Sequence, residues 1–266
     1  MSKVPASSAY SYPLLIKQLL HASMLTSPKQ EIISGNLRKY DYLTLKSRIE
    51  KLAAGLSAIG VKPSDTVAVM NWDCHRYLEC FFAIPMMGAI LHTINIRLSP
   101  EQLLYTINHA EDDVILVHQD FVEMLEQIKD RIDRPVKLVF LHDSAEKQPL
   151  PNGFDIEYES LLEISERRFV FEDFDESTIA TTFYTTGTTG DPKGVYYSHR
   201  QLVLHTMGLV AAISPIDDHI RLAKTDVYMP MTPMFHVHGW GIPYAATMLG
   251  LKQVYPTRYE DRKSVV

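Results

Sequence analysis

The residues most suited to chemistry lie in a short loop that holds four threonines, three glycines and one lysine within ten positions. They are Thr185, Thr186, Gly187, Thr188, Thr189, Gly190, Lys193 and Gly194. Glycine lets the backbone approach a ligand and adopt positive φ, so that successive N–H groups can converge on an anion. The threonine hydroxyls add donors, and Lys193 adds a mobile positive charge. The loop therefore predicts a cradle for a polyphosphate.

Two familiar nucleotide-binding patterns do not fit this loop. Counting from Gly187, the P-loop pattern needs glycine where Pro192 stands and serine or threonine where Gly194 stands. The dinucleotide pattern G-x-G-x-x-G also fails, because the glycines are spaced three and four apart. A threonine- and glycine-rich surface loop without a ligand is the alternative interpretation.

The elements that must position the loop alternate between strands and helices. We expect strands over residues 31–34, 38–42, 66–70, 89–94, 114–117, 136–141, 179–184, 195–197, 227–231 and 253–255. We expect helices over residues 13–25, 45–59 with Thr44 as N-cap, 74–87, 100–110, 121–132, 199–213 and 239–249. Repeated β-α-β units with short apolar strands predict an α/β fold with parallel sheets flanked by helices on both faces. Ligands of such folds bind at the carboxyl ends of strands, where this loop begins.

Composition narrows the classes of partner. The net charge is −6 over 266 residues, and residues 143–178 alone carry eleven acidic and three basic side chains. No continuous basic surface is expected, which argues against a nucleic acid partner. Cys74 and Cys80 fit neither a disulfide framework nor a zinc site, which favours a reducing, cytoplasmic environment. The longest apolar run, residues 81–91, is too short to span a bilayer and contains Pro85.

The loop resembles the phosphate-binding motif of the adenylate-forming superfamily, which includes acyl-CoA synthetases, luciferases and adenylation domains. That motif reads Thr/Ser-Ser/Thr-Gly-Thr-Thr-Gly-x-Pro-Lys-Gly, and residues 185–194 match it at every fixed position. Residues 71–101 are also similar to the early region of bacterial fatty acyl-CoA synthetases. Residues 233–241 resemble the superfamily's second core motif, beside the acyl pocket, and residues 243–247 continue in the manner of the medium- and long-chain fatty acid branch. The resemblance covers nearly all of the chain.

The resemblance implies a role for several residues. Lys193 would contact the β- or γ-phosphate of ATP, and the hydroxyl of Thr185 would join an acidic residue outside this sequence around Mg²⁺. His236 would lie at the carboxylate end of the acyl pocket, with Gly239 beside it and Trp240 as a gate to the fatty-acid tunnel. A packed loop histidine and an ordinary core tryptophan are the alternatives for the last pair. Metal binding by His236 and His238 is disfavoured, because a spacing of two does not put both on one face.

The implied activity is that of an AMP-forming acid–thiol ligase, which uses ATP, Mg²⁺ and CoA on a fatty acid. Family members are about twice as long, and their later nucleotide-binding motifs, hinge and catalytic lysine are missing here. We therefore expect an N-terminal portion that is not active alone, with most of the CoA site outside this sequence. The alternative is a naturally short protein that binds a nucleotide or a partner without catalysis.

The family's organisation also predicts domain boundaries. Residues 44–214 would form a first α/β subdomain, and residues 1–43 and 215–266 would form pieces of a second, with the C-terminal catalytic domain absent. We expect an incomplete second subdomain to leave apolar residues uncovered in segments 227–231 and 243–249. Association of the isolated chain, for example as a homodimer, would follow.

Overall fold

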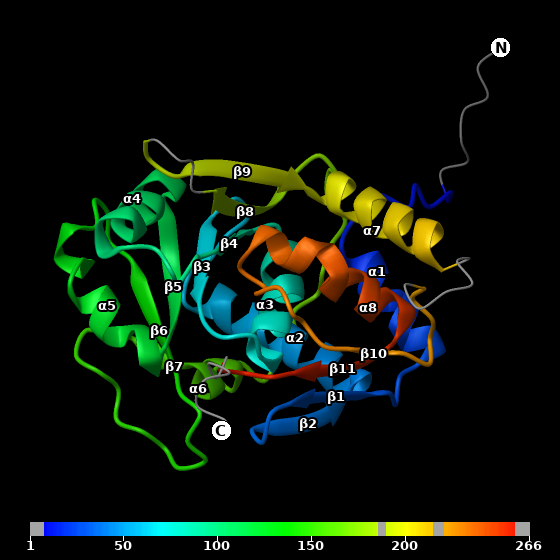
Figure 1. Ribbon diagram of the computed structural model, residues 1–266, viewed down its shortest axis with the longest axis horizontal. Helices are drawn as coiled ribbons and strands as arrows, with labels where there is room; N and C mark the ends of the chain where they lie inside the picture. The colour runs from blue at the N-terminus through cyan, green and yellow to red at the C-terminus, as the bar shows by residue number, and fades with distance from the viewer. Residues whose placement is uncertain (1–7, 186–189, 215–220, 259–266) are drawn as a thin grey trace, which may run out of the picture.

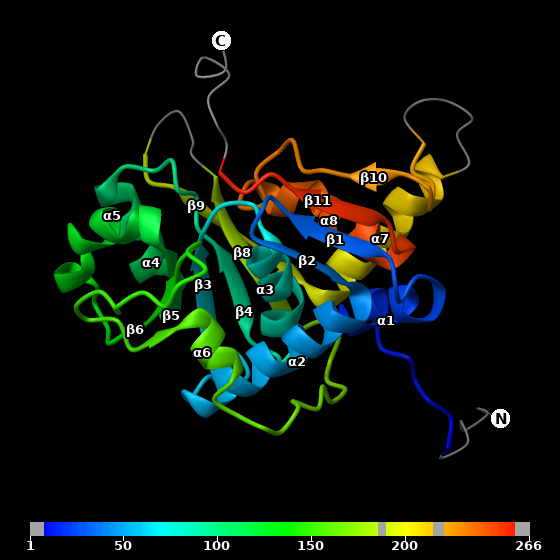
Figure 2. The ribbon, with the colours of Figure 1, turned by 90° about the horizontal axis from the view of Figure 1, so that it is seen from below.

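The computed structural model describes residues 8–185, 190–214 and 221–258, which form two β-sheets and the helices that cover them (Figures 1 and 2). The larger sheet has seven strands in the order β7-β6-β5-β3-β4-β8-β9, and the smaller has four in the order β10-β11-β1-β2. Both consist mainly of parallel pairs, and the prediction of an α/β fold is confirmed.

The larger sheet is parallel except at one edge, where β9 runs antiparallel to β8. Its strands are β3 (Thr66–Met70), β4 (Ile90–Thr93), β5 (Asp112–His118), β6 (Lys137–Leu141), β7 (Ile156–Glu157), β8 (Ile179–Thr185) and β9 (Lys193–Ser198). The central strands are apolar on both faces, as strands covered by helices on both sides must be.

Right-handed crossovers decide which face each helix covers. Figure 2 shows α4 and α5 on one face of the larger sheet and α2 and α3 on the other. The helices of this part are α2 (Tyr42–Ala58), α3 (His75–Met86), α4 (Pro100–Ala110), α5 (Val122–Glu126), α6 (Tyr158–Leu162) and α7 (His199–Ile213). Helix α3 also contacts β1, so it lies between the two sheets.

The smaller sheet joins strands from distant parts of the sequence. It contains β1 (Glu31–Ser34), β2 (Arg38–Asp41), β10 (Val227–Tyr228) and β11 (Lys252–Tyr255), and β1 pairs in parallel with β11. Helices α1 (Lys17–Thr26) and α8 (Ile242–Leu249) pack against each other beside it (Figure 1). The apolar core continues from this sheet through α3 to the larger one.

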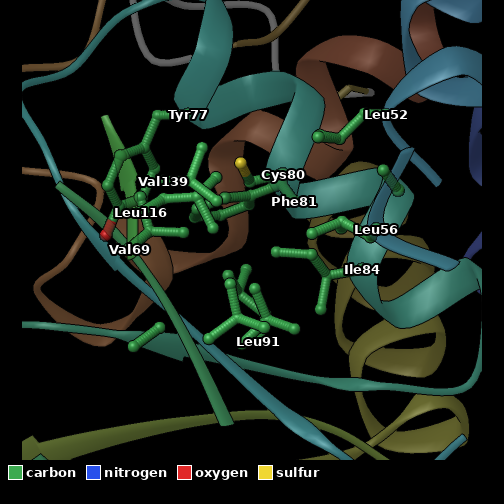
Figure 3. Packing of buried hydrophobic residues seen from close by; sticks show 14 of the residues in the cluster. Leu52, Leu56, Val69, Tyr77, Cys80, Phe81, Ile84, Leu91, Leu116 and Val139 are labelled. Atoms are coloured by element: carbon green, nitrogen blue, oxygen red, sulfur yellow. The ribbon is translucent and has the colours of Figure 1, made fainter. Parts of the chain in front are cut away.

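Figure 3 shows the part of the core where α2 and α3 meet the larger sheet. The buried side chains come from α2, α3 and four strands, and include Leu52, Leu56, Val69, Tyr77, Cys80, Phe81, Ile84, Leu91, Leu116 and Val139. Each fully buried aliphatic or aromatic side chain of this kind stabilises the fold by about 1.5–3 kcal/mol. Both cysteines are buried and free.

The structure corrects two expected helix starts. Helix α1 begins at Lys17 rather than residue 13, because the N–H groups before it are taken by distant side chains. Leu14 N–H donates to Glu176 and Ile16 N–H donates to Nδ1 of His199. Helix α2 begins at Tyr42, and its N-cap is Asp41, whose carboxylate accepts a hydrogen bond from the N–H of Thr44 at 2.9 Å.

Two other expected helices are shorter than their apolar patterns indicate. The 121–132 segment contains only the five residues of α5, flanked by 3₁₀ turns at Gln119–Phe121 and Lys129–Arg131. The 239–249 helix begins at Ile242, because residues 237–241 form a left-handed turn. The expectation that segment 243–249 is left uncovered is wrong, since α8 is packed against α1 and Tyr244 is fully buried. In segment 227–231, Val227, Met229 and Met231 are exposed as expected.

Candidate functional site

The candidate phosphate loop connects the two strands of an edge hairpin. Strands β8 and β9 pair in antiparallel fashion, and the last pair before the loop joins Thr185 to Lys193. The Thr185 hydroxyl donates to the carbonyl oxygen of Lys193 at 3.5 Å, and both side chains are exposed. A lysine ammonium and a hydroxyl are therefore presented together at the carboxyl end of β8, the edge that the fold predicts for a ligand.

Only the two ends of the loop itself are described. Gly190 has φ +97°, which an ordinary side chain rarely adopts, and a Cβ built there would meet no atom of the described residues within 4 Å. The predicted contacts Thr186, Gly187, Thr188 and Thr189 lie outside the described residues.

The second candidate segment, residues 233–241, is held against two strands of the larger sheet. The N–H of Met234 donates to a carboxylate oxygen of Asp73, after β3, at 2.9 Å, and the Thr93 hydroxyl on β4 donates to Phe235 O at 3.2 Å. Met234 and Phe235 are buried. These contacts hold the segment at the carboxyl ends of β3 and β4, so it shares the ligand edge with the phosphate loop.

The segment continues into a left-handed turn. Five consecutive residues from Val237 to Gly241 have φ between +49° and +71°. Three of them are not glycine, and each such residue costs of order 1–3 kcal/mol unless the surroundings hold it in place. One such contact comes from α7, where Nε2 of His205 lies 3.1 Å from the carbonyl oxygen of Trp240. A side chain at Gly241 would overlap the His205 ring, with its Cβ 2.8 Å from Cδ2.

The two candidate segments meet through His238. Its ring lies 5.0 Å from that of Phe183 on β8 and 6.2 Å from that of Tyr197 on β9, both edge-on. Burial lowers the pKa of His238 to about 3, against the opposing effect of a hydrogen bond with the Thr182 backbone. His238 is thus a buried histidine that is neutral at neutral pH. Its contacts with Phe183 and Tyr197 join residues 233–241 to the base of the hairpin.

The left-handed turn separates the predicted substrate residues from this packed core. His236 and Trp240 are exposed, Trp240 by 59%, whereas Gly239 is buried with His238. The alternative of an ordinary core tryptophan is therefore wrong. His236 and His238, two residues apart, therefore lie in different surroundings, one exposed and one buried.

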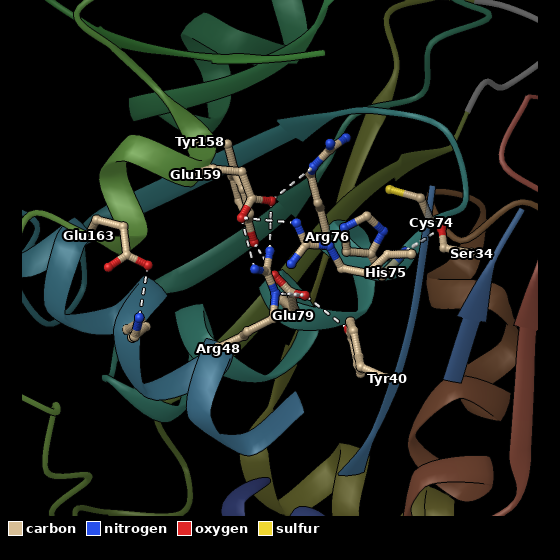
Figure 4. Close-up of polar contacts among 12 residues, drawn as sticks. Ser34, Tyr40, Arg48, Cys74, His75, Arg76, Glu79, Tyr158, Glu159 and Glu163 are labelled. Atoms are coloured by element: carbon tan, nitrogen blue, oxygen red, sulfur yellow. Dashed lines mark hydrogen bonds and ion pairs between the residues drawn. The ribbon is translucent and has the colours of Figure 1, made fainter. Parts of the chain in front are cut away.

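A charged cluster inside the fold was not anticipated from the sequence. Figure 4 shows Arg48 of α2 donating to Glu79 of α3 at 2.7 Å and, through two nitrogens, to Glu159 of α6 at 2.8 Å each. Glu79 is fully buried and also accepts from Tyr40 of β2 and Tyr158 of α6. The available signal was a glutamate within the largely apolar α3. The cluster joins β2 of the smaller sheet to α2, α3 and α6, and so holds α3 between the two sheets.

Other classes of site were also searched. Within the described residues there is no cluster of three or more histidine, cysteine, aspartate or glutamate side chains that could hold a metal ion. Across those same residues, no helix combines the length and apolar character needed to cross a membrane.

The sequence comparison decides the family. Residues 20–266 match the family described as AMP-binding enzyme. The chain belongs to this family. It is 38% identical to a long-chain-fatty-acid–CoA ligase of Thermus thermophilus over 242 residues, which is 90% of this chain and 42% of that protein. It is also 38% identical to a medium-chain-fatty-acid–CoA ligase of Ectopseudomonas oleovorans over 224 residues, which is 84% of this chain and 40% of that protein.

Solved structures give the same fold for this AMP-binding enzyme chain. A long-chain-fatty-acid–CoA ligase from Archaeoglobus fulgidus superposes with a TM-score of 0.76 at 22% identity, over 97% of this chain and 50% of that one. The chain thus spans about two fifths of the length of the curated relatives named above, and about half of this structural neighbour.

Proposed function

We propose that this chain is the part of an ATP-dependent fatty acid–CoA ligase that holds the phosphates of ATP and the carboxylate end of the acid. The observation that carries the proposal is the β8–β9 hairpin, where Thr185 and Lys193 stand as a pair at the base of a glycine-rich loop. The segment that contains His236 and Trp240 packs against the same hairpin through His238. The names of the relatives support a fatty acid as the substrate.

The reaction would proceed in two steps. A carboxylate oxygen of the acid attacks the α-phosphorus of ATP, the bond to the β-phosphate oxygen breaks, and pyrophosphate leaves. The CoA thiol then displaces AMP and forms the thioester, and its proton passes to solvent. A carboxylate is already ionised at neutral pH, so adenylation needs positioning and charge stabilisation rather than a base.

In the first step Lys193 and the loop N–H groups would hold the β- and γ-phosphates, on which negative charge accumulates as pyrophosphate leaves. The exposed Lys193 ammonium, at the end of an edge strand, is suited to this role. We propose Lys193 as a catalytic and ATP-binding residue. Thr185, Thr186, Gly187, Thr188, Thr189 and Gly190 would supply the remaining loop contacts.

Among the described residues, we propose one oxygen of this chain as a ligand for Mg²⁺. Thr185 offers an exposed hydroxyl next to the proposed phosphate site. Magnesium prefers six oxygen ligands and retains several waters, with carboxylates and substrate phosphates as the usual partners. We therefore propose Thr185 as a single Mg²⁺ ligand and assign the acidic partner and most of the CoA site to sequence outside this chain.

The acid would be recognised by residues 236–240. His236 stands where an amino-acid-activating relative would need a negative charge for the substrate ammonium, so an unsubstituted carboxylic acid is favoured. Gly239 and Trp240 would line the entrance for the acyl chain. We propose residues 44–214 as one subdomain and residues 1–43 with 215–266 as parts of another, in a protein that works in the reducing cytoplasm.

Replacement of Lys193 tests the phosphate assignment. In the full-length ligase, Lys193→Ala should slow ATP–pyrophosphate exchange by a factor that corresponds to about 2–4 kcal/mol, the range for one oriented charged donor. Lys62→Ala, which removes an exposed lysine far along the chain from the loop, is the matched control and should leave exchange unchanged. Normal exchange in the Lys193 variant would refute the assignment.

Substrate class is tested by the formation of CoA esters across a panel of acids. Fatty acids of medium to long chain should be preferred over short acids, benzoate and amino acids. A preference for an amino acid or a benzoate would show that residues 236–240 have been assigned the wrong ligand. Absence of any ester or exchange in the full-length protein would favour a non-catalytic nucleotide-binding role.

A further inference from the structure

Tyr184 lies at the base of the phosphate loop, one residue before the last pair of the β8–β9 hairpin. Its backbone pairs with Gly194, and the following pair, Thr185 with Lys193, is the last before the loop. Because alternate residues of a strand face opposite sides, Tyr184 points to the α4 face, away from Phe183 and His238. Its side chain is 6% exposed. A movement of the Tyr184 ring would therefore change the position of Lys193, the residue at which β9 begins.

A histidine from α4 holds the Tyr184 hydroxyl. Nδ1 of His109, in the last turn of that helix, is 2.8 Å from the hydroxyl oxygen. The His109 ring itself packs at a tilt against Tyr105 one turn earlier, with ring centres 5.5 Å apart. Helix α4 is a fixed support, since a capping box closes its first turn and Leu103 and Ile107 are fully buried.

A second histidine faces the Tyr184 ring from the sheet. The His92 ring on β4 lies with its centre 5.2 Å from that of Tyr184. His92 is fixed in turn by the buried carboxylate of Asp112, which is 2.9 Å from its Nδ1. The tyrosine is therefore enclosed between two histidines that belong to different elements.

The backbone of Gly194 packs against a third side of the Tyr184 ring. A Cβ built at Gly194 would lie 3.3 Å from two ring atoms of Tyr184 and 3.4 Å from the ring of Tyr196. This is tighter than ordinary van der Waals contact, so the ring takes the space that a side chain would need. The residue that follows Lys193 is thus packed directly onto the ring that His109 holds.

We propose that His109 and Tyr184 are positioning residues for the phosphate loop. Their hydrogen bond, together with the contact on Gly194, fixes the base of the hairpin to α4 and so sets the direction of the Lys193 side chain. The inference rests on the proposed function, because it assumes that Lys193 meets the phosphates of ATP. Neither residue touches a substrate, and the predicted effect is confined to ATP.

The test compares four single variants of the full-length ligase in ATP–pyrophosphate exchange. Tyr184→Phe and His109→Leu each remove the hydrogen bond, and His109→Gln retains a group that can form it. Tyr197→Phe, on the same hairpin but on its other face, is the matched control. We expect the KM for ATP to rise about 3- to 10-fold in the first two variants, the range for one hydrogen bond. The KM for the fatty acid should stay within about twofold, and His109→Gln and Tyr197→Phe should stay close to wild type.

The double variant Tyr184→Phe/His109→Leu should be no worse than Tyr184→Phe alone, because that substitution already removes the hydroxyl that contacts His109 and Tyr196. An equal loss for ATP and for the fatty acid, with a lower Tm, would overturn the proposal and leave the pair as ordinary packing. An unchanged KM for ATP in both single variants, alongside an impaired Lys193→Ala, would also overturn it. If Lys193→Ala itself were normal, the proposed function would fail instead, so the two failures are distinguishable.

Discussion

The carboxylate of Asp73, just after β3, accepts a hydrogen bond from the backbone N–H of Met234, 161 residues later in the sequence. Asp73 is 1% exposed and its backbone also pairs with Thr257 beyond β11. One buried acid thus joins the larger sheet, the proposed acyl segment and the end of the smaller sheet. The ligand edge of the molecule is organised by a residue that carries no proposed chemistry.

Removal of this acid should destabilise the ligand edge. Asp73→Ala leaves the buried N–H of Met234 without its acceptor, which costs about 1–3 kcal/mol in the free energy of unfolding. Urea unfolding of the purified chain measures the loss. Asp73→Asn keeps an oxygen that can accept the same hydrogen bond and should retain more of the stability than the alanine variant. Equal losses in both variants would assign the effect to the charge rather than to this hydrogen bond.

Two helical glycines should respond in opposite directions to the same substitution. Gly55 in α2 lies against α6, where a Cβ would overlap the carbonyl oxygen of Leu161. Gly208 in α7 would place its Cβ where no atom of the described residues lies within 4 Å. Alanine in a helix is favoured over glycine by about 0.5–1 kcal/mol. We expect Gly208→Ala to stabilise by about that amount.

At Gly55 the steric term should exceed this propensity. Overpacking against a well-packed neighbour costs about 1–3 kcal/mol, and a backbone carbonyl yields less than a flexible side chain. Gly55→Ala should therefore lower the free energy of unfolding, measured in parallel with Gly208→Ala. A stabilised Gly55 variant would contradict the close approach of α2 and α6.

Buried histidines should make the fold sensitive to mild acid. Burial lowers the pKa of His238 to about 3 and that of His199 to about 4, whereas an unfolded histidine titrates near 6.5. Between about pH 6.5 and 4 the unfolded chain binds protons that the native chain does not, so stability falls as the pH is lowered. Each histidine contributes a slope of about 1.4 kcal/mol per pH unit within that window.

Substitution of one histidine isolates its share of this slope. His238→Asn, which tolerates the left-handed backbone at this position, should reduce the slope of unfolding free energy against pH by about one proton's worth. His21→Asn, at an exposed position on α1, is the control. An unchanged slope in the His238 variant would contradict the lowered pKa of this ring in the native fold.

The isolated chain should associate through segment 227–231. Val227, Met229 and Met231 are 56%, 47% and 73% exposed, and apolar side chains gathered in this way favour association. Light scattering should detect dimers or larger species, and Val227→Thr/Met229→Gln/Met231→Gln should shift the population toward monomer. Leu25→Gln, which removes an exposed leucine on α1, is the control. A monodisperse monomer in the unmodified chain would refute the expectation.

Sequence reasoning predicted most of the strands, including the two of the β8–β9 hairpin, because those signals are local. It missed β7 (Ile156–Glu157), and it expected a strand over residues 227–231 where β10 contains only Val227–Tyr228. Residues 179–184 are β-branched and aromatic, and the loop after them matches a family motif. The start of α1 was missed because it depends on distant partners: Glu176 and His199 hold the residues before α1. The start of α2 was placed wrongly although its signal is local, since Asp41 rather than Thr44 is the N-cap. For the left-handed turn at residues 237–241, the local signal in the sequence is limited to two glycines. His205, which contacts the carbonyl oxygen of Trp240, is 35 residues away from it.

In the candidate site, too, the local contacts can be predicted from the sequence and the contacts between distant segments cannot. Lys193 and Thr185 are neighbours in the hairpin, as a motif alone can indicate. The contacts of Tyr184 with His109 and His92 join residues 75 and 92 positions apart, and no period or motif connects them. The Arg48–Glu79–Glu159 cluster is likewise assembled from three helices. Contacts between distant segments become visible only when the sheet order is known.

The parallel pairing of β1 with β11 has a consequence for synthesis on the ribosome. Ile32 pairs with Gln253, so 221 further residues must be synthesised before the partner of Ile32 exists. At about 5–20 residues per second this takes roughly 10–45 s. An isolated two-stranded hairpin is marginal in water, so β1 and β2 spend that interval with one edge open to other nascent chains. Charged side chains along β2, from Arg38 to Asp41, are the kind of residue that discourages such pairing at the opposite edge. The edge of β1 that β11 will occupy has Ile32 and Ile33 at its centre. We expect a chaperone that acts during synthesis to shield this edge.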